Sequence, residues 1–294
     1  MSVSNGFAAH GLDLLAQMMA ASGIRQANAT AFAAAAASLK TAMVATMWNG
    51  TAFCDGICSE VDGHSLVMTN MFSLCFGMVP PENIPQAWHT VTSWGLEQMG
   101  DYGAFWYQMA VASGYYAPHY DTPDDGTAIL TALTKCDRYS WCSGLRDDNL
   151  TMTRESWHDG TYSHEWGTSP IVGVVWGILG VHQTAPAFAT FTVKPKLATL
   201  AHAAITIPTI RGYINVTAGP GAVDVDVPCN TLATLCMPRS AQDGGILLTP
   251  LSTRLLLDGS EVPAIAIGGH LCARAAIGCG AEGATRSLRA QPRV

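Results

Sequence analysis

The hydrophobic pattern of this chain changes its period near Pro186. Before that residue, apolar side chains recur at three- and four-residue spacing, which is typical of amphipathic helices. After it come short apolar runs about 8–12 residues apart, each bounded by Pro, Gly, Asn or Asp, which is typical of antiparallel strands. The pattern therefore predicts helical hairpins followed by an antiparallel β-sandwich.

Three regions follow from this change of period. We expect a helical domain over residues 1–185, a β-sandwich domain over 186–275, and a loosely ordered tail over 276–294, which is rich in Ala, Gly and Arg. Helices are expected at about 7–21, 29–46, 65–76, 84–99, 103–113, 125–135 and 169–179. In the third of these, Gly77 is placed to end the helix, and Pro80-Pro81 forbids its continuation.

Composition excludes several classes of partner. Hydrophobic residues make up 49% of the chain and charged residues 13%, so most of it can bury apolar surface and fold. The chain has a formal net charge of −7 and therefore no excess of Lys and Arg to neutralise phosphate groups, so no nucleic-acid partner is expected. The longest apolar run, Ile171–Val181, is shorter than the roughly 20 residues that span a bilayer, so no membrane partner is expected either.

Cysteines and glycosylation sequons bear on the compartment. The 9 cysteines are scattered and form no CxxC pair, which favours mostly buried free thiols, with one or two disulfides if the protein is secreted. The sequons at Asn28, Asn49, Asn149 and Asn215 favour the secretory pathway, although no signal peptide is visible. The compartment therefore stays open.

No cofactor or metal site is expected. The 9 histidines show no H-E-x-x-H pattern. The acidic cluster Asp121, Asp124 and Asp125 lacks the spacing of a calcium loop, and Asp124 is better interpreted as a helix N-cap.

Three short segments in a fixed order carry a family resemblance. Thr151–Trp157 reads TMTRESW, Ser163–Pro170 reads SHEWGTSP, and Gly177–Val181 reads GILGV. This order resembles the C-terminal part of the catalytic domain of the α-L-rhamnosidases, which are six-hairpin glycosidases, and the resemblance extends to about residue 275. It implies a partial toroid of helical hairpins followed by an antiparallel β-sandwich, and an inverting glycoside hydrolase that acts on terminal rhamnose.

The resemblance also implies the site residues. Glu155 is the general base, and His164 binds substrate. The indoles of Trp157, Trp166, Trp141 and Trp48 suit a sugar platform, and Asp55 and His64 belong to the same site. Each has a plainer alternative: Glu155 could pair with Arg154 or Arg146, His164 and the tryptophans could be structural, and Asp55 and His64 could cap the helix that starts near residue 65.

The sequence departs from the family in one respect. The family's general acid lies in a D-x-x-x-R-x-E segment, and no such segment occurs in residues 1–150. About seven helices are predicted, whereas six hairpins need twelve. We therefore expect a truncated form without its acid, with self-association through the uncovered helices at 7–21 and 29–46. The alternatives are an inactive carbohydrate-binding remnant and another six-hairpin specificity.

Overall fold

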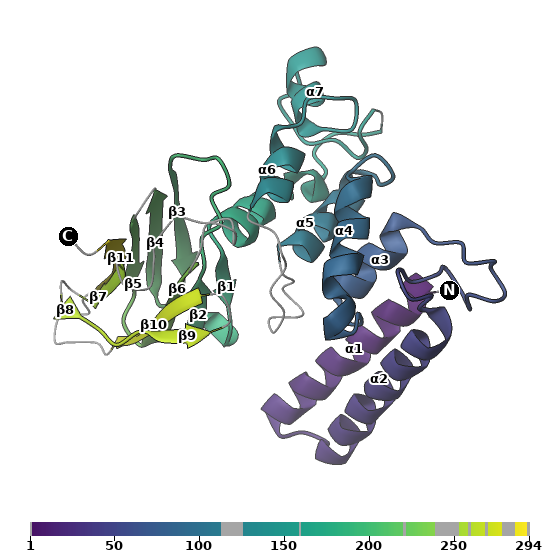
Figure 1. Cartoon of the computed structure of the whole chain (residues 1–294), viewed down its shortest axis with the longest axis horizontal. Coiled ribbons are helices and arrows are strands. Elements are labelled where there is room, and N and C mark those ends of the chain that lie inside the picture. Colours follow the sequence, from purple (N-terminus) through teal and green to yellow (C-terminus); the bar gives the residue numbers. More distant parts are fainter. Residues whose placement is uncertain are drawn as a thin grey trace. The chain divides into compact units, whose positions relative to one another are not determined.

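A computed structural model describes residues 2–112, 126–158, 160–219, 222–238, 253–257, 260–267, 270–277 and 286–292 (Figure 1). The structure combines helices and strands, and 21% of the chain is strand. Helices precede strands, and the first strand begins at Val181, close to the predicted change of period. The chain divides into two compact units: Met1–Thr122 with Met152–Gly167, and Pro123–Thr151 with Thr168–Val294.

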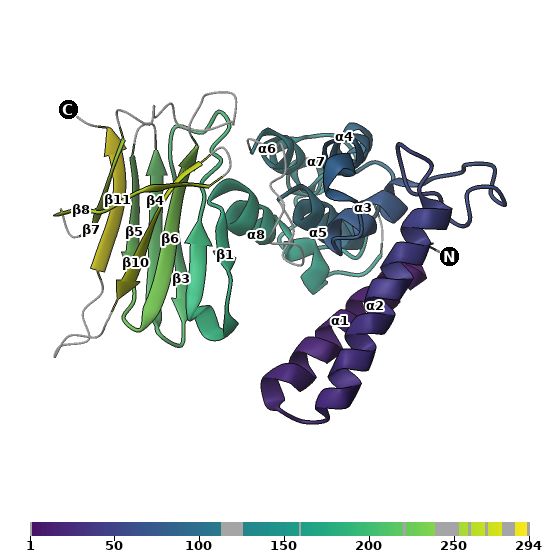
Figure 2. The same ribbon diagram turned by 60° about the horizontal axis from the view of Figure 1, so that its bottom comes forward.

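The first unit is helical. Its helices are α1 (Ser2–Ser22), α2 (Gln26–Met47), α3 (Val67–Cys75), α4 (Ile84–Trp94) and α5 (Asp101–Val111), with a 3₁₀ turn at Pro81–Asn83. The helices α1 and α2 form a hairpin (Figure 2). Small residues are buried on both of them, among them Gly6, Ala9, Ala16, Ala29 and Ala36. Small side chains allow two helix backbones to approach closely, as the Ala-rich sequence predicts.

The end of α3 shows how local sequence fixes a boundary. Gly77 has a φ of 63°, a left-handed conformation that favours glycine. Its N–H donates to the carbonyl of Leu74 at 3.1 Å, and the N–H of Met78 donates to that of Ser73 at 2.9 Å. This pair of bonds is a Schellman motif, so the predicted helix end is confirmed.

An aromatic cluster joins α1 to α3 and α5. The ring of Phe7 lies 4.9 Å from those of Phe72 and Phe76 and 5.6 Å from that of Trp106, centroid to centroid. Aromatic pairs at these distances add to the stabilisation from burial alone. The cluster fixes the base of the α1–α2 hairpin on the rest of the unit.

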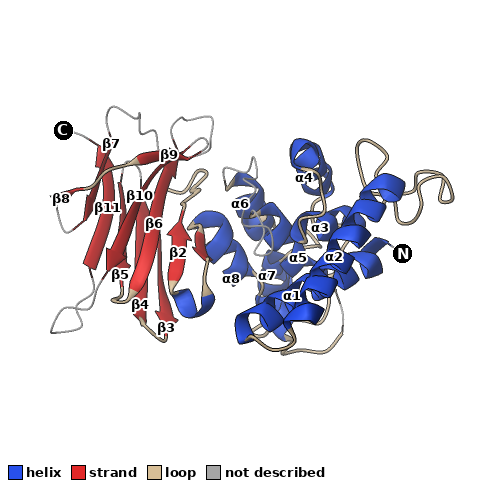
Figure 3. Ribbon diagram, turned by 90° about the horizontal axis from the view of Figure 1, so that it is seen from below, coloured by secondary structure: helices blue, strands red, loops and turns tan. Residues whose placement is uncertain are grey.

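The second unit combines short helices with all the described strands (Figure 3). Its helical segments are α6 (Thr127–Thr134), α7 (Trp141–Asp147), α8 (Pro170–Val172), a π-helical turn at Gly173–Ile178 and a 3₁₀ turn at Pro186–Phe188. Its strands are β1 (Val181–Gln183), β2 (Thr190–Val193), β3 (Ala203–Thr209), β4 (Gly212–Gly219), β5 (Ala222–Val227), β6 (Thr231–Pro238), β7 (Thr253–Leu257), β8 (Ser260–Glu261), β9 (Ile265–Ile267), β10 (His270–Ile277) and β11 (Arg286–Pro292).

The strands form two sheets. One has the order β1-β2-β6-β10-β9 and the other β3-β4-β5-β11-β7-β8, and every pair is antiparallel except β2 with β6. Alternate residues of β5, such as Val223, Val225 and Val227, are fully buried, and Phe191 and Leu235 are buried in the other sheet. Each sheet thus has a buried face, which a sandwich requires.

The predicted domain boundaries stay a prediction. Within the second unit, α6 packs on the π-helical turn: a Cβ on Gly177 would lie 2.7 Å from Cγ1 of Ile129. Within the segment predicted as a loose tail, Arg286–Pro292 forms β11 between β5 and β7. Backbone pairing orders this segment although its sequence has no clear period.

The expectation of mostly free thiols is wrong. Disulfides join Cys54 to Cys58, Cys136 to Cys142 and Cys236 to Cys272, and Cys229 is also disulfide-bonded. The register of β6 with β10 places Cys236 directly opposite Cys272, a proximity that linear spacing cannot reveal. Among the described cysteines Cys75 is free; it is buried, and burial raises the pKa of its thiol.

The α1–α2 hairpin exposes apolar surface. On and after α1, Leu14, Leu15, Met18 and Ile24 are 38–68% exposed. Among the described helices, α2 is long and apolar enough to cross a membrane by length and composition, and 17% of its most apolar window is buried. Signal sequences and core helices meet the same criterion, so α2 does not establish a membrane span. Self-association through this hairpin stays a prediction.

Candidate functional site

The segment that carries the family resemblance folds back on itself in the first unit. We call residues 153–158 and 160–166 the site loop. The N–H of Glu155 donates to the carbonyl of Thr161 at 3.0 Å, and that of Ser163 to the carbonyl of Thr153 at 2.8 Å, on either side of a bridge between Arg154 and Tyr162. This pairing brings Glu155 beside His164.

The Glu155 carboxylate is held by donors from across the loop. Its Oε2 accepts the backbone N–H of Thr161 at 2.9 Å and the Thr161 hydroxyl at 3.1 Å. The same hydroxyl oxygen lies 2.5 Å from Nε2 of His164, which is 3.7 Å from Oε2 of Glu155. The Thr161 hydroxyl thus lies between the Glu155 carboxylate and the His164 ring and links the two.

The site is open to solvent. The side chain of Glu155 is 46% exposed and that of His164 is 22% exposed. An ordered carboxylate with this exposure can take a proton from a water molecule, or it can accept a hydrogen bond from a sugar hydroxyl. The arrangement can therefore support general-base chemistry.

Gly160 allows the loop to close on Glu155. Its φ is 92°, and a Cβ at this position would lie 2.7 Å from Cβ and 2.8 Å from Oε2 of Glu155. Any side chain here would strain the backbone and displace the carboxylate.

Three aromatic rings lie close to one another at the site loop. The indole of Trp166 donates from Nε1 to the carbonyl of Glu155 at 3.0 Å, and its ring lies 4.2 Å from that of His164 and 6.0 Å from that of Tyr102. Tyr102 belongs to the first turn of α5 and is 52% exposed. Exposed aromatic faces beside polar groups are suited to the apolar face of a sugar ring.

Trp157 anchors the loop, and the carboxyl of Asp101 is buried in the same unit. Trp157 is 5% exposed, and its Nε1 donates to the carbonyl of Met99 at 2.7 Å. The structure thus places this predicted sugar platform in the core. Asp101 is 3% exposed, and its Oδ1 has no hydrogen-bond partner among the described residues. Burial raises the pKa of Asp101 to about 6, against a lowering by the charge of Arg154.

Asp55 and His64, which were predicted as site residues, lie at the N-terminus of α3. Asp55 accepts the N–H of Leu66 at 3.1 Å and the hydroxyl of Thr69 at 2.5 Å through Oδ1, and its Oδ2 lies 2.7 Å from Nδ1 of His64. These contacts support the alternative that Asp55 and His64 organise a helix N-terminus.

The other two predicted tryptophans lie away from the site loop in the chain. The Trp48 ring packs edge-on against Phe53, 5.1 Å away, in the connection between α2 and α3. Trp141 is the first residue of α7 in the second unit. Of the predicted residues, the structure brings together Glu155, His164 and Trp166.

The described residues hold no group of three or more His, Cys, Asp or Glu side chains that could bind a metal ion. Asp121, Asp124 and Asp125 lie outside the described residues.

Four residues of the site region are not among the predicted ones: Gly160, Thr161, Tyr102 and Asp101. The Asp-Gly pair at 159–160 is a turn signal that could have pointed to a reversal next to Glu155. Thr161 follows that turn directly. Tyr102 and Asp101 are distant in sequence from the loop, and no local pattern connects them to it.

Comparison with known proteins gives the fold. Residues 180–246 match the family described as the bacterial α-L-rhamnosidase C-terminal domain. The structure resembles an α-L-rhamnosidase from Dictyoglumus thermophilum, with a TM-score of 0.72, 13% identity, and coverage of 96% of this chain and 31% of that one. It also resembles a Streptomyces avermitilis α-L-rhamnosidase complexed with L-rhamnose, with a TM-score of 0.68, 14% identity, and coverage of 97% and 26%.

A GH78 family rhamnosidase of Bacillus sp. GL1 matches with a TM-score of 0.55, 21% identity, and coverage of 75% of this chain and 24% of that one. No protein with curated annotation matches the sequence. The chain has an α-L-rhamnosidase-like fold, and it spans less than a third of the length of each of these solved structures.

Proposed function

We propose that this chain, with its α-L-rhamnosidase-like fold, carries the base side of an inverting glycosidase site for terminal α-L-rhamnose. The observation that carries the proposal is the exposed Glu155 carboxylate, held by Thr161 and His164 beside the ring of Trp166. Inverting hydrolysis needs a base that takes a proton from water on the opposite side of the sugar ring from the leaving oxygen.

In the proposed reaction, Glu155 accepts a proton from water as the water oxygen bonds to the anomeric carbon. The bond from that carbon to the leaving oxygen breaks, and the leaving oxygen takes a proton from a general acid. His164 binds a sugar hydroxyl, and Trp166 with Tyr102 supports the apolar face of the ring. We propose that these 294 residues lack the acid, because residues 1–150 contain no D-x-x-x-R-x-E segment.

The buried carboxyl of Asp101 does not replace that acid. It is 3% exposed, so it cannot reach a leaving oxygen in the open site. The consequence for the chain alone is binding of rhamnose with little hydrolysis of ordinary rhamnosides. This is also the alternative function, a carbohydrate-binding remnant.

The test is a titration of the chain with L-rhamnose, combined with an assay of 4-nitrophenyl α-L-rhamnoside. We expect saturable rhamnose binding that His164→Ala weakens and Glu155→Gln leaves nearly unchanged, and no nitrophenol release above background. Stronger binding of L-fucose or a glucuronide would favour another six-hairpin specificity. Nitrophenol release that Glu155→Gln abolishes would show that an acid lies within these residues.

A further inference from the structure

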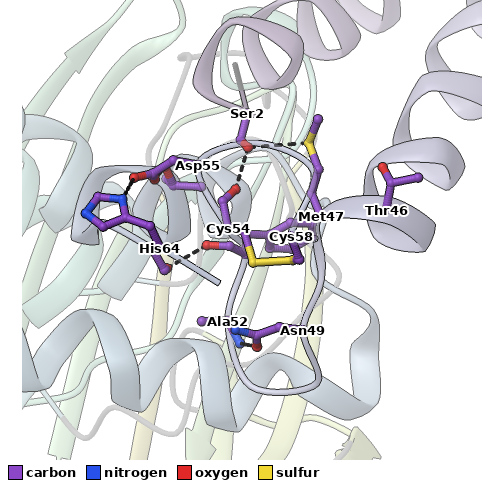
Figure 4. Close-up of a disulfide and its surroundings, with 12 residues drawn as sticks. Ser2, Thr46, Met47, Asn49, Ala52, Cys54, Asp55, Cys58 and His64 are labelled. Carbon is purple, nitrogen blue, oxygen red and sulfur yellow. Dashed lines mark hydrogen bonds and ion pairs between the residues drawn. A yellow bond between two sulfur atoms is a disulfide. The ribbon is translucent and has the colours of Figure 1, made fainter. Parts of the chain in front are cut away.

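The connection between α2 and α3 contains an ordered turn around the sequon Asn49-Gly50-Thr51 (Figure 4). The side-chain Oδ1 of Asn49 accepts three hydrogen bonds, each 2.9 Å long, from the N–H and hydroxyl of Thr51 and the N–H of Ala52. The backbone N–H of Asn49 donates to the carbonyl of Ala52 at 3.1 Å. The two polar side chains of the sequon are thus already joined within an Asx turn.

The turn is on the surface. Asn49, Gly50 and Thr51 are all exposed. Gly50 has a φ of 100°, and a Cβ built on it would meet nothing within 4 Å. A bulky group attached at this point has room outside the fold.

Covalent and backbone bonds hold the turn in place. Cys54 and Cys58 form a disulfide, the N–H of Cys54 donates to the carbonyl of Met47 at 2.7 Å, and that of Cys58 to the carbonyl of Thr46 at 3.1 Å. Figure 4 shows this disulfide beside the turn that carries Asn49. The exposed loop is therefore a defined structure.

The disulfides point independently to the compartment. Three are present among the described residues, and disulfides form and persist in the oxidising secretory pathway and outside the cell. N-linked oligosaccharides are added to secreted proteins at surface sequons.

From the turn and the disulfides together, we infer that Asn49 is an N-glycosylation site. The donor is an oligosaccharide linked to a lipid through pyrophosphate. The amide nitrogen of Asn49 bonds to the anomeric carbon of the first sugar, and the bond from that carbon to the pyrophosphate oxygen breaks. The lipid pyrophosphate leaves with the electron pair, and a base of the transferase takes the amide proton, so no oxidant or reductant is needed.

Asn215 provides a matched internal control. It also lies in a sequon, but it is half-buried within β4, where Nδ2 donates to Asp226 at 3.2 Å and Oδ1 accepts from Thr206 at 2.8 Å. Both ends of its amide are occupied by neighbouring strands. A glycan there would break this cross-strand network, so we expect the folded, secreted protein to carry no glycan at Asn215.

The experiment is expression of the full chain behind a secretion leader in yeast or insect cells. Secreted and cell-associated protein are treated with peptide N-glycosidase in heavy-oxygen water and mapped by mass spectrometry. In the secreted protein we expect a heavy-oxygen-labelled aspartate at the position of Asn49, formed only when the glycosidase is present, and none at that of Asn215. Because glycan transfer precedes folding, the cell-associated fraction gives an answer even for a variant that is not secreted.

Variants give the second measurement. Asn49→Gln and Thr51→Ala should each abolish the gel-mobility shift that one glycan causes. Thr51→Ser should keep that shift, and Asn215→Gln should leave the mobility unchanged. An Asn49 peptide that is unmodified in both fractions, while another sequon carries a glycan, would overturn the inference.

Discussion

Replacing the buried Asp101 by Asn should stabilise the first unit at neutral pH. This carboxyl is 3% exposed, and its Oδ1 has no hydrogen-bond partner among the described residues. Burial raises its pKa to about 6, although the charge of Arg154 acts in the opposite direction. In the unfolded chain its pKa is about 3.9.

The two values fix the sign and size of the effect. Between about pH 4 and pH 6 the folded protein binds the Asp101 proton while the unfolded chain does not, so the free energy of unfolding falls as the pH rises. Above about pH 6 Asp101 is ionised in both the folded and the unfolded chain, and the folded protein bears the full free-energy cost of burying the charged carboxylate. A shift of about two units corresponds to about 3 kcal/mol. Asn has no charge to desolvate and is free of this cost at every pH.

The assay is urea unfolding of both proteins at intervals from pH 4 to pH 7, followed by far-ultraviolet circular dichroism. The quantity of interest is the difference between the two free energies of unfolding, in which the titration of all other groups cancels. We expect the advantage of Asp101→Asn to grow by about 3 kcal/mol from pH 4 to pH 7.

Asp147→Asn is the matched control, because a hydrogen bond from Arg146 lowers the pKa of this exposed carboxyl. Because this pKa lies below its ordinary value, Asp147 is ionised in both the folded and the unfolded chain from about pH 4 to pH 7, so its difference curve should be nearly flat there. A difference curve for Asp101→Asn that is flat from pH 4 to pH 7 would show that the buried carboxyl is not the source of the cost.

Three further outcomes are expected. His182 is half-buried, and desolvation lowers its pKa to about 4, so the native chain should lose stability as the pH falls from about 6.5 to about 4, and His182→Gln should reduce that loss in unfolding experiments. Gly160→Ala should weaken rhamnose binding in a titration, because the new methyl group would lie 2.7 Å from Cβ of Glu155; unchanged affinity would contradict this steric argument. Replacing Cys236 and Cys272 by Ser should lower the free energy of unfolding by about 4 kcal/mol, because their disulfide closes a 36-residue separation.

Local signals predicted the end of one helix and missed the end of another. The expected helix over 65–76 is observed as α3, because Gly77 adopts the left-handed conformation that the prediction assumed. The expected helix over 84–99 ends earlier, at Trp94, where Gly95 also has a positive φ of 58°. The short helix α7 was not predicted, because seven residues carry little periodicity.

Contacts between distant residues were beyond the sequence pattern. The burial of Trp157 depends on the carbonyl of Met99, and the disulfide between Cys236 and Cys272 depends on strand register. A Trp next to a carboxylate is equally typical of a sugar platform and of a core anchor. Residues 153–166 of the site could be predicted by resemblance, whereas Tyr102 could be found only in three dimensions.

The proposed role of Glu155 can be tested apart from that of a general acid. A 2,4-dinitrophenyl α-L-rhamnoside has a leaving group that departs without protonation, so its hydrolysis needs the base alone. The matched control is Glu165→Gln, which removes an exposed carboxylate beside His164.

The decisive measurement is the turnover of this activated substrate by the chain and by Glu155→Gln, with the anomer of the released rhamnose identified by NMR. We expect inversion at the anomeric carbon, a loss of turnover of about 10²–10⁴-fold in Glu155→Gln, the usual contribution of a positioned base, and no loss in Glu165→Gln. Equal turnover by the chain and Glu155→Gln, when both bind rhamnose, would contradict the assignment of Glu155 as the general base.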